Sequence, residues 1–446
     1  MDARRAAELL RALTEEHAVP GAQLALYTGS KIVSVATGVV RAGEVRRVDT
    51  DTMFAFGSVT KAFTATLALQ LVADGDVGLD EPMADLLPSW RRTRSKALAR
   101  ITLRHLLSHT AGLVADHQLA DMGDRSLARY AASVADLPVL CAPGSRFSYA
   151  NTGYNVVGQL IEELSGMPWQ TALREFLLEP LGAEPRLLNA RDGSGRATAS
   201  GHVVQPGGRA AVPVNLFLPA TWAPAGGLVG SAEDLLALAR LHIGAHLEAD
   251  RLLDTEHRSQ MHRTQEGADA FGMANGWALG LGSYGDGDAW LGHDGTVDGA
   301  TCHLRFHPAT GTAVALTTNA TTGTLLWPDL VDRLRRRGVP VGDYEPALDA
   351  PPADGPESVD PDHVVGDYAN GDTVFSVRPH GDGVRLSDRT GLVADLTLHR
   401  RLAFEARRLD SGQAPWIGRF LMDDDAPGAT LMQLTGRSAA RVPTAA

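Results

Sequence analysis

The stretch Ser58-Val59-Thr60-Lys61 places a lysine three residues after a serine, at the start of a predicted helix. Residues i and i+3 lie on one face of a helix, so Lys61 can reach the Ser58 hydroxyl. A serine hydroxyl is a weak nucleophile unless a base lies beside it. Arginine, which is far commoner than lysine in this chain, stays protonated and could not be that base. The pattern therefore predicts a nucleophile, Ser58, and its base, Lys61.

A second motif, Tyr149-Ala150-Asn151, precedes a predicted helix. Tyrosine can act as a base where neighbouring cations lower its pKa. The Asn151 amide is suited to bind a substrate carbonyl and to hold the lysine. The structural alternatives are a buried Tyr149 with a bonded hydroxyl and an Asn151 that caps the next helix.

A third motif, His293-Asp294-Gly295-Thr296, lies just before a predicted strand. Glycine allows a close approach to the backbone, so Gly295 is a candidate substrate-binding residue. We expect the Thr296 and Ser58 amides to form an oxyanion hole, in which one donor can be worth about 3 kcal/mol. His293 is expected to position the reacting groups; the alternative is a histidine in a surface loop.

The order Ser-Lys, Tyr-Asn, His-Gly resembles the serine β-lactamase and penicillin-binding-protein superfamily, whose nucleophile lies in a Ser-x-x-Lys motif. Similar phrases surround it, at Phe56 to Lys61, Leu106 to Leu113 and Ala225 to Ser231. Typical β-lactamases carry Lys-Thr-Gly as the third motif, and this chain lacks that lysine. Penicillin hydrolysis is therefore not expected. The His-x-Gly form is more like class C-related esterases, peptidases and acyltransferases.

The order of predicted elements indicates an α+β chain in two parts. Strands near Gly21 to Val40 and Ala300 to Thr318, with helices between them, predict one sheet built from both ends of a domain. Pro340 to Asp362 is rich in Pro, Asp, Glu and Gly and reads as a linker. The expected division is a β-lactamase/transpeptidase-like domain with a helical insert at residues 1–339, a linker at 340–362, and a small lipocalin-like β-barrel at 363–446.

Composition excludes several classes of partner. The 446 residues carry a formal net charge of −12 without a basic run, which argues against nucleic acid and anionic membranes. Met1 to Ala18 forms a charged amphipathic pattern without the apolar core of a signal peptide, so we expect a cytoplasmic protein. No cofactor and no metal are expected, and the oligomeric state is left open.

In its expected location and its two-part layout, the chain is most similar to the penicillin-binding-protein-type thioesterases. These enzymes release and cyclise nonribosomal peptides. The resemblance implies that Ser58 takes a peptide from the phosphopantetheine arm of a peptidyl carrier domain. The peptide's own amine then closes a head-to-tail lactam. The resemblance also implies a D-residue or glycine at the peptide C-terminus.

Two further kinds of site residue follow from the sequence. Trp222 is a candidate pocket wall, or else a core residue. In this family an arginine near the end of the β-domain can reach the active site, which makes Arg437 and Arg441 candidates; the alternative for each is a solvated surface arginine.

Three rival functions remain. The first is a hydrolase of the same superfamily, an esterase or D-stereospecific peptidase that shares the acyl-enzyme. The second is a non-catalytic penicillin-recognising sensor or scaffold. The third is a cell-wall transpeptidase, which the expected location disfavours.

Overall fold

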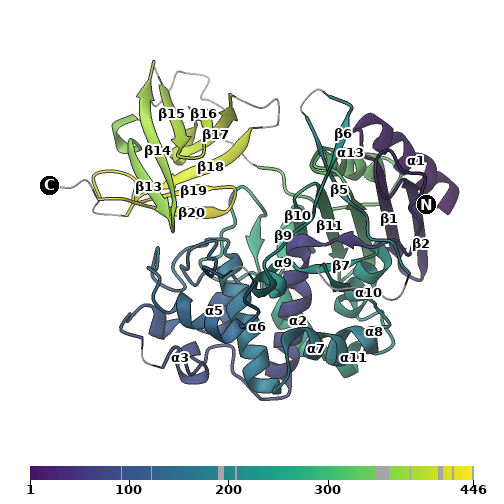
Figure 1. The fold of residues 1–446 in the computed structure, drawn as a ribbon, viewed down its shortest axis with the longest axis horizontal. Helices are drawn as coiled ribbons and strands as arrows, with labels where there is room; N and C mark the ends of the chain where they lie inside the picture. The colour runs from purple at the N-terminus through teal and green to yellow at the C-terminus, as the bar shows by residue number, and fades with distance from the viewer. Residues whose placement is uncertain are drawn as a thin grey trace.

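The computed structural model describes the chain except residues 92, 122, 189–194, 206–207, 347–360, 382, 410–414, 424–425 and 444–446. A seven-stranded antiparallel sheet forms the centre of the first domain, in the order β2-β1-β12-β11-β10-β9-β8 (Figure 1). In that order the strands are Lys31–Gly38, Gly21–Thr28, Thr312–Thr318, Ala300–His307, Trp290–Val297, Gly282–Tyr284 and Gly276–Trp277. β1 pairs with β12, so both ends of the domain meet inside one sheet, as the sequence predicts.

Both faces of this sheet are covered, because side chains alternate along each strand. Leu24 and Leu26 of β1 lie in a core cluster with residues of α1 (Ala3–Glu16) and α13 (Gly323–Arg335). Ala25 and Tyr27 point the other way and join the cluster of the helical layer. The sheet is thus held between two layers of helices, and its strand ends are free to build a site.

The helical layer contains the long helices α2 (Thr60–Ala73), α6 (Asn151–Ser165) and α10 (Ala232–Ile243). Ser231 caps α10 through a reciprocal pair of hydrogen bonds with Asp234. The shorter helices are α3 (Met83–Leu86), α4 (Leu103–Leu107), α5 (Leu127–Val134), α7 (Trp169–Leu173), α8 (Glu179–Leu181), α9 (Ala223–Gly226), α11 (Ala249–Leu252) and α12 (Thr255–His262). Short strands β3 (Phe54–Ala55), β7 (Leu228–Gly230) and β4 (Arg186–Leu187) form a small sheet, and β5 (Gly201–Val204) pairs with β6 (Ala211–Val214).

The second domain is a closed antiparallel barrel, which confirms the predicted lipocalin-like fold (Figure 1). Its strands β13 to β20 are Gly366–Asn370, Thr373–His380, Gly383–Asp388, Val393–Leu398, Ala403–Arg408, Trp416–Leu421, Leu431–Leu434 and Arg437–Arg441. Closure removes the free strand edges that would otherwise pair with another chain.

The hairpin between β19 and β20 docks the barrel on the first domain. Its turn residues Thr435 and Gly436 have φ of 47° and 76°, the left-handed conformation of a tight hairpin turn. The Gly436 carbonyl accepts a hydrogen bond from the Tyr149 amide at 2.9 Å. Ser438 donates through its hydroxyl to the Phe147 carbonyl at 2.9 Å. The barrel therefore lies against the second sequence motif.

The chain between the domains begins packed against the first domain. Val341 is buried, and the Tyr344 hydroxyl accepts a hydrogen bond from the Gly272 amide. Residues 347–360, most of the predicted linker, lie outside the described residues. None of the helices in the described part of the chain has both the length and the apolar character needed to span a bilayer.

Candidate active site

The nucleophile lies in a tight turn rather than in the helix itself. Ser58 belongs to the 3-10 turn η1 (Gly57–Val59), and α2 begins two residues later, at Thr60. The turn is possible because Gly57 has φ of 50°, and a Cβ added there would lie 2.7 Å from the Thr296 carbonyl oxygen. The predicted spacing of serine and lysine survives this change, since the turn continues directly into the helix.

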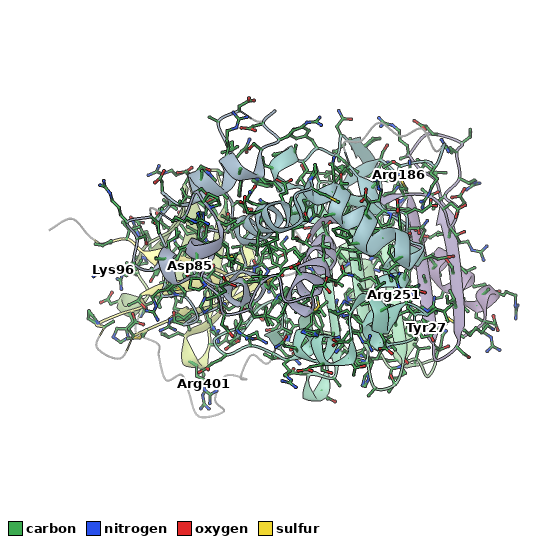
Figure 2. The ribbon with its side chains drawn as sticks, turned by 90° about the horizontal axis from the view of Figure 1, so that it is seen from below. Tyr27, Asp85, Lys96, Arg186, Arg251 and Arg401 are labelled. Carbon is green, nitrogen blue, oxygen red and sulfur yellow. The ribbon has the colours of Figure 1, made fainter. Side chains whose placement is uncertain are left out.

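Lys61 is fully buried beside the serine. Its Nζ lies 3.0 Å from Ser58 Oγ and 2.6 Å from the Ala225 carbonyl oxygen. Burial, reinforced by the charge of Arg437, holds the pKa of Lys61 well below its usual value. The other lysines, Lys31 and Lys96, are exposed, and Figure 2 shows Lys96 at the edge of the molecule. Lys61 can therefore be neutral and accept the Ser58 proton.

Tyr149 is buried with its hydroxyl facing Ser58, but that hydroxyl makes no hydrogen bond of normal geometry within the described residues. Lys61 Nζ lies 5.0 Å from the centre of the Tyr149 ring. Burial raises the pKa of Tyr149, and this outweighs the opposing effects of Ser58 and Arg437. The expected lowering of the tyrosine pKa by cations is thus overridden. Tyr149 is suited to give a proton, and Lys61 to take one.

Asn151 is the first residue of α6, and its side chain does not cap the helix. Its amide donates to Asp116 Oδ1 at 2.6 Å, and Arg437 donates to Asp116 Oδ2 at 2.6 Å. Among the described residues, Lys61 is held by the Ala225 carbonyl and not by Asn151, contrary to expectation. Asp116 carries no motif and is the main site residue that sequence reasoning missed.

The two candidate arginines of the barrel differ. Arg437 reaches the first domain through Asp116, whereas Arg441 donates to the Ala429 and Val365 carbonyls within the barrel. Of the two arginines, only Arg437 lowers the pKa of Lys61 and of Tyr149 through its charge. The structure therefore places Arg437 at the site and Arg441 away from it.

Strand β10 forms the opposite wall of the site. A Cβ added at Gly295 would lie 2.0 Å from the Phe56 carbonyl oxygen and 3.1 Å from the Ser58 amide nitrogen. A Cβ added at Gly57 would lie 2.9 Å from the Thr296 amide nitrogen. The glycines thus let the turn pack against the strand, and they put the backbones of Ser58 and Thr296 next to each other, as the expected oxyanion hole requires.

His293 is buried, which excludes the surface-loop alternative. Its Nδ1 lies 2.6 Å from the Asp294 carbonyl oxygen, which can only accept, so Nδ1 carries the hydrogen. Nε2 is then an acceptor, and it is buried without a partner in the described part of the chain. Burial and the charge of Lys61 lower the pKa of His293 to about 3, so the ring is neutral.

Asp294 anchors the third motif to the sheet. Its carboxylate accepts two hydrogen bonds from the fully buried Arg305, each 2.9 Å long, and one from His303 at 2.7 Å. Arg305 also donates to Asp343 at 2.7 Å. The His303 ring stacks on Trp327 with centroids 4.7 Å apart. Sequence reasoning missed this network, because its members are spread over two strands, β10 and β11, over helix α13 and over the segment after it.

One cavity opens at Ser58, and a second lies beside it, on the other side of Thr296. The smaller, about 240 Å³, is lined by Ser58, Asn151 and Trp222, whose indole donates to the His117 carbonyl at 2.8 Å. This places Trp222 on a cavity wall. The larger, about 1030 Å³, is lined by His293 and by residues of the barrel. Thr296 borders both.

Comparison with known proteins identifies the family. The Beta-lactamase family profile matches residues 6–334. The chain belongs to the β-lactamase family. Among relatives of this family, it is 35% identical to "Penicillin-binding protein 4" of Amycolatopsis lactamdurans, over 81% of this chain and 96% of that protein. It is 28% identical to "Esterase EstB" of Burkholderia gladioli, over 69% of this chain and 88% of that one.

One solved structure of the β-lactamase family extends the similarity into the barrel. SurE is 40% identical and superposes with a TM-score of 0.88, covering 98% of each chain. A second structure, SurE with D-Leu, superposes with a TM-score of 0.85 at 39% identity. Members of this family are hydrolases of the serine acyl-enzyme type, which the Ser58 and Lys61 geometry fits.

Proposed function

We propose that the protein is a thioesterase and peptide cyclase that takes a peptidyl thioester onto Ser58 and releases it as a head-to-tail lactam. The observation that carries this proposal is the 3.0 Å approach of a fully buried lysine to the serine hydroxyl. It makes Ser58 the point of acyl attachment. The two-domain similarity to SurE and the structure of SurE with D-Leu support the cyclase and a D-residue at the peptide C-terminus.

Acylation proceeds through Lys61. The neutral amine accepts the Ser58 proton as Oγ attacks the thioester carbonyl carbon, and the Ser58 and Thr296 amides bind the oxyanion. The carbon–sulfur bond then breaks. The thiolate of the phosphopantetheine arm takes the proton back from Lys61, with Tyr149 as the relay beside Oγ. The arm leaves as a thiol and the peptide remains as an ester on Ser58.

Release reverses these proton transfers. The N-terminal amine of the same peptide attacks the ester carbonyl, loses one proton to Lys61, and forms the amide bond as the bond to Oγ breaks. Ser58 recovers that proton. A held amine has an effective molarity of about 10⁵ M or more, so cyclisation outruns attack by water when the amine is well oriented.

We assign the binding of the acyl part of the substrate to Asn151, Asp116 and Arg437. We propose that the Asn151 amide binds the peptide next to the ester and that Arg437 orients it. The smaller cavity, walled by Trp222, takes the side chain of the C-terminal residue. Its volume of about 240 Å³ suits one side chain, which agrees with discrimination at that residue. The natural donor is a peptidyl carrier domain of a peptide synthetase.

The test is a peptidyl N-acetylcysteamine thioester with a D-residue at its C-terminus. We expect thiol release and a cyclic product of mass lower by one water than the linear acid, both lost in Ser58→Ala. A matched substrate with an L-residue at the C-terminus should react slowly. Linear acid as the sole product would support a hydrolase instead.

A hydrolase is the second candidate, because the EstB similarity covers most of that esterase. It shares every step up to the ester on Ser58 and differs only in the acceptor. A non-catalytic sensor predicts that Ser58→Ala leaves the cellular role unchanged. Measuring thiol release therefore separates the sensor from the enzymes, and the product separates the enzymes from each other.

A further inference from the structure

The larger cavity lies between the two domains. Trp277 and His293 line it from the sheet, while Trp416 and Thr435 line it from the barrel. Its volume of about 1030 Å³ is roughly four times that of the smaller cavity and falls at the upper end of the range for ligand pockets. Thr296, whose amide is an expected oxyanion donor, borders both cavities.

The barrel wall of this cavity is fixed to the catalytic residues. The hairpin that carries Thr435 accepts a hydrogen bond from the Tyr149 amide through Gly436, and Gln433 donates to the Phe147 carbonyl at 3.3 Å. A ligand that touches Trp416 and Thr435 would therefore be held at a set position relative to Tyr149. Aromatic walls at Trp277 and Trp416 suit an apolar side chain.

Three buried side-chain atoms of this lining have no partner among the described residues: the acceptor His293 Nε2, the indole nitrogen of Trp277 and the hydroxyl of Thr322. His293 holds its hydrogen on Nδ1 against the Asp294 carbonyl, which leaves Nε2 as a buried lone pair without a partner among the described residues. A carboxylate has no hydrogen to offer this atom. An amine can donate a hydrogen to Nε2, and its lone pair remains available for attack. Leaving a buried acceptor without a partner is unfavourable, so the site favours a ligand that supplies the missing hydrogen.

We propose that the inter-domain cavity binds the N-terminal end of the peptide, as a neutral primary amine on a residue with an apolar side chain, and that His293 Nε2 accepts a hydrogen bond from that amine. His293 orients the amine and does not take its proton, which goes to Lys61 and then to Ser58 Oγ. The inference rests on the proposed cyclase function and names the part of the site that chooses the acceptor.

The first test measures how the acyl-enzyme divides between products. We expect Trp416→Ala to lower the ratio of cyclic peptide to linear acid about tenfold or more, because a loosely held amine loses effective molarity. The rate of thiol release, which reports acylation, should change little. Phe217→Ala is the matched aromatic variant at the smaller cavity and should slow thiol release instead. An unchanged product ratio in Trp416→Ala would overturn the proposal.

The second test uses external amines on an acyl-enzyme whose acyl group has no free amine. An N-acetylated D-residue thioester is offered with phenylalaninamide or glycinamide at equal concentration. We expect the wild-type enzyme to form the phenylalanyl amide preferentially, and Trp416→Ala to lose that preference. His293→Leu should lower amide formation by about tenfold, the effect of one hydrogen bond, and His293→Gln, which keeps an acceptor, should restore part of it.

The outcomes separate the two proposals. If the wild-type enzyme forms neither lactam nor amide but hydrolyses the ester, the cyclase function itself fails. If it forms both, and the Trp416 and His293 variants keep the wild-type preference and product ratio, the function stands and the amine site lies elsewhere.

Discussion

Burial shifts the two proton-carrying side chains of the site in opposite directions. It favours the neutral form of each, which lowers the pKa of Lys61 and raises that of Tyr149. Burial therefore favours the free base of Lys61 and the protonated acid of Tyr149. A pair of this kind can both take a proton from the serine and give one to a leaving group.

Replacing Lys61 by arginine should strongly slow acylation, because it puts a permanent positive charge where the mechanism needs a neutral amine. Arginine stays protonated and cannot accept the Ser58 proton, so we expect a loss of about 10²–10⁴-fold in the rate of thiol release. Lys96→Arg, at an exposed position, is the control and should retain the wild-type rate.

The pH dependence of the same rate tests the neutral lysine. Since the unprotonated amine is the active form, the rate should rise with pH through the pKa of Lys61 and reach a plateau well below the usual lysine range. A rate that still climbs steeply at the usual lysine pKa would show that the lysine is charged in the folded protein.

Gly295→Ala tests the contact between the nucleophile turn and β10. The new methyl group would lie 2.0 Å from the Phe56 carbonyl oxygen, so the strand and turn must separate. We expect thiol release to fall about 10²–10³-fold, the effect of losing an oxyanion donor. Gly78→Ala is the control, because its added Cβ has ordinary contacts only, the nearest at 3.7 Å. Equal rates in the two variants would contradict the assignment.

At the scale of elements, β10 is held by an ion pair at Asp294, and its next residue, Gly295, leaves room for the nucleophile turn. Arg305 holds Asp294 from β11 and also binds Asp343, which lies beyond α13. This ion pair fixes the residue between His293 and Gly295. The site thus depends on a charged network whose members make no contact with the serine.

Arg305→Met should destabilise the fold, because it leaves the carboxylates of Asp294 and Asp343 without their buried partner. Breaking a buried ion pair costs about 3–5 kcal/mol, to be measured as a lower free energy of unfolding in urea. Arg4→Met removes a surface pair with Glu8, in which both side chains are exposed, and should cost about 1 kcal/mol or less. A loss for Arg305→Met no larger than this control would show that the network is not structural.

Local spacing explains what the sequence could predict at this scale. Ser58 and Lys61 are three residues apart, and the hairpin of β1 and β2 is marked by a turn, so both are readable from short stretches. The hydrogen bond from Arg437 to Asp116 joins residues more than three hundred positions apart, and the local sequence around either residue does not predict it. The raised pKa of Tyr149 was equally hidden, because burial depends on the whole fold.

At the scale of the molecule, the barrel supplies part of the active site. Arg437 comes from its last strand, binds Asp116, and helps to keep Lys61 neutral. The barrel also contacts the second motif through its last hairpin, where Gly436 accepts the hydrogen bond of the Tyr149 amide. The second domain is therefore a component of the catalytic centre and not an appended module.

Arg437→Gln should change the pH profile as well as the rate. Removing its charge raises the pKa of Lys61, so the rising limb of thiol release should move to higher pH. Asp116→Asn should slow the same step, and the double variant should be no slower than the worse single variant, because both residues act in one network. Arg385→Gln, which breaks another barrel pair at 2.7 Å, should leave the profile in place.

The position of Arg437 in the chain has a consequence for biosynthesis. Ser58 and Lys61 are translated early. The active site is complete only after β10, then Asp343 of the ion pair with Arg305, and finally the last strand of the barrel have been made. A ribosome-bound chain that has folded only its first domain would carry the nucleophile without its full setting. Such a chain would not yet form an acyl-enzyme efficiently, so activity would begin only when the barrel has folded.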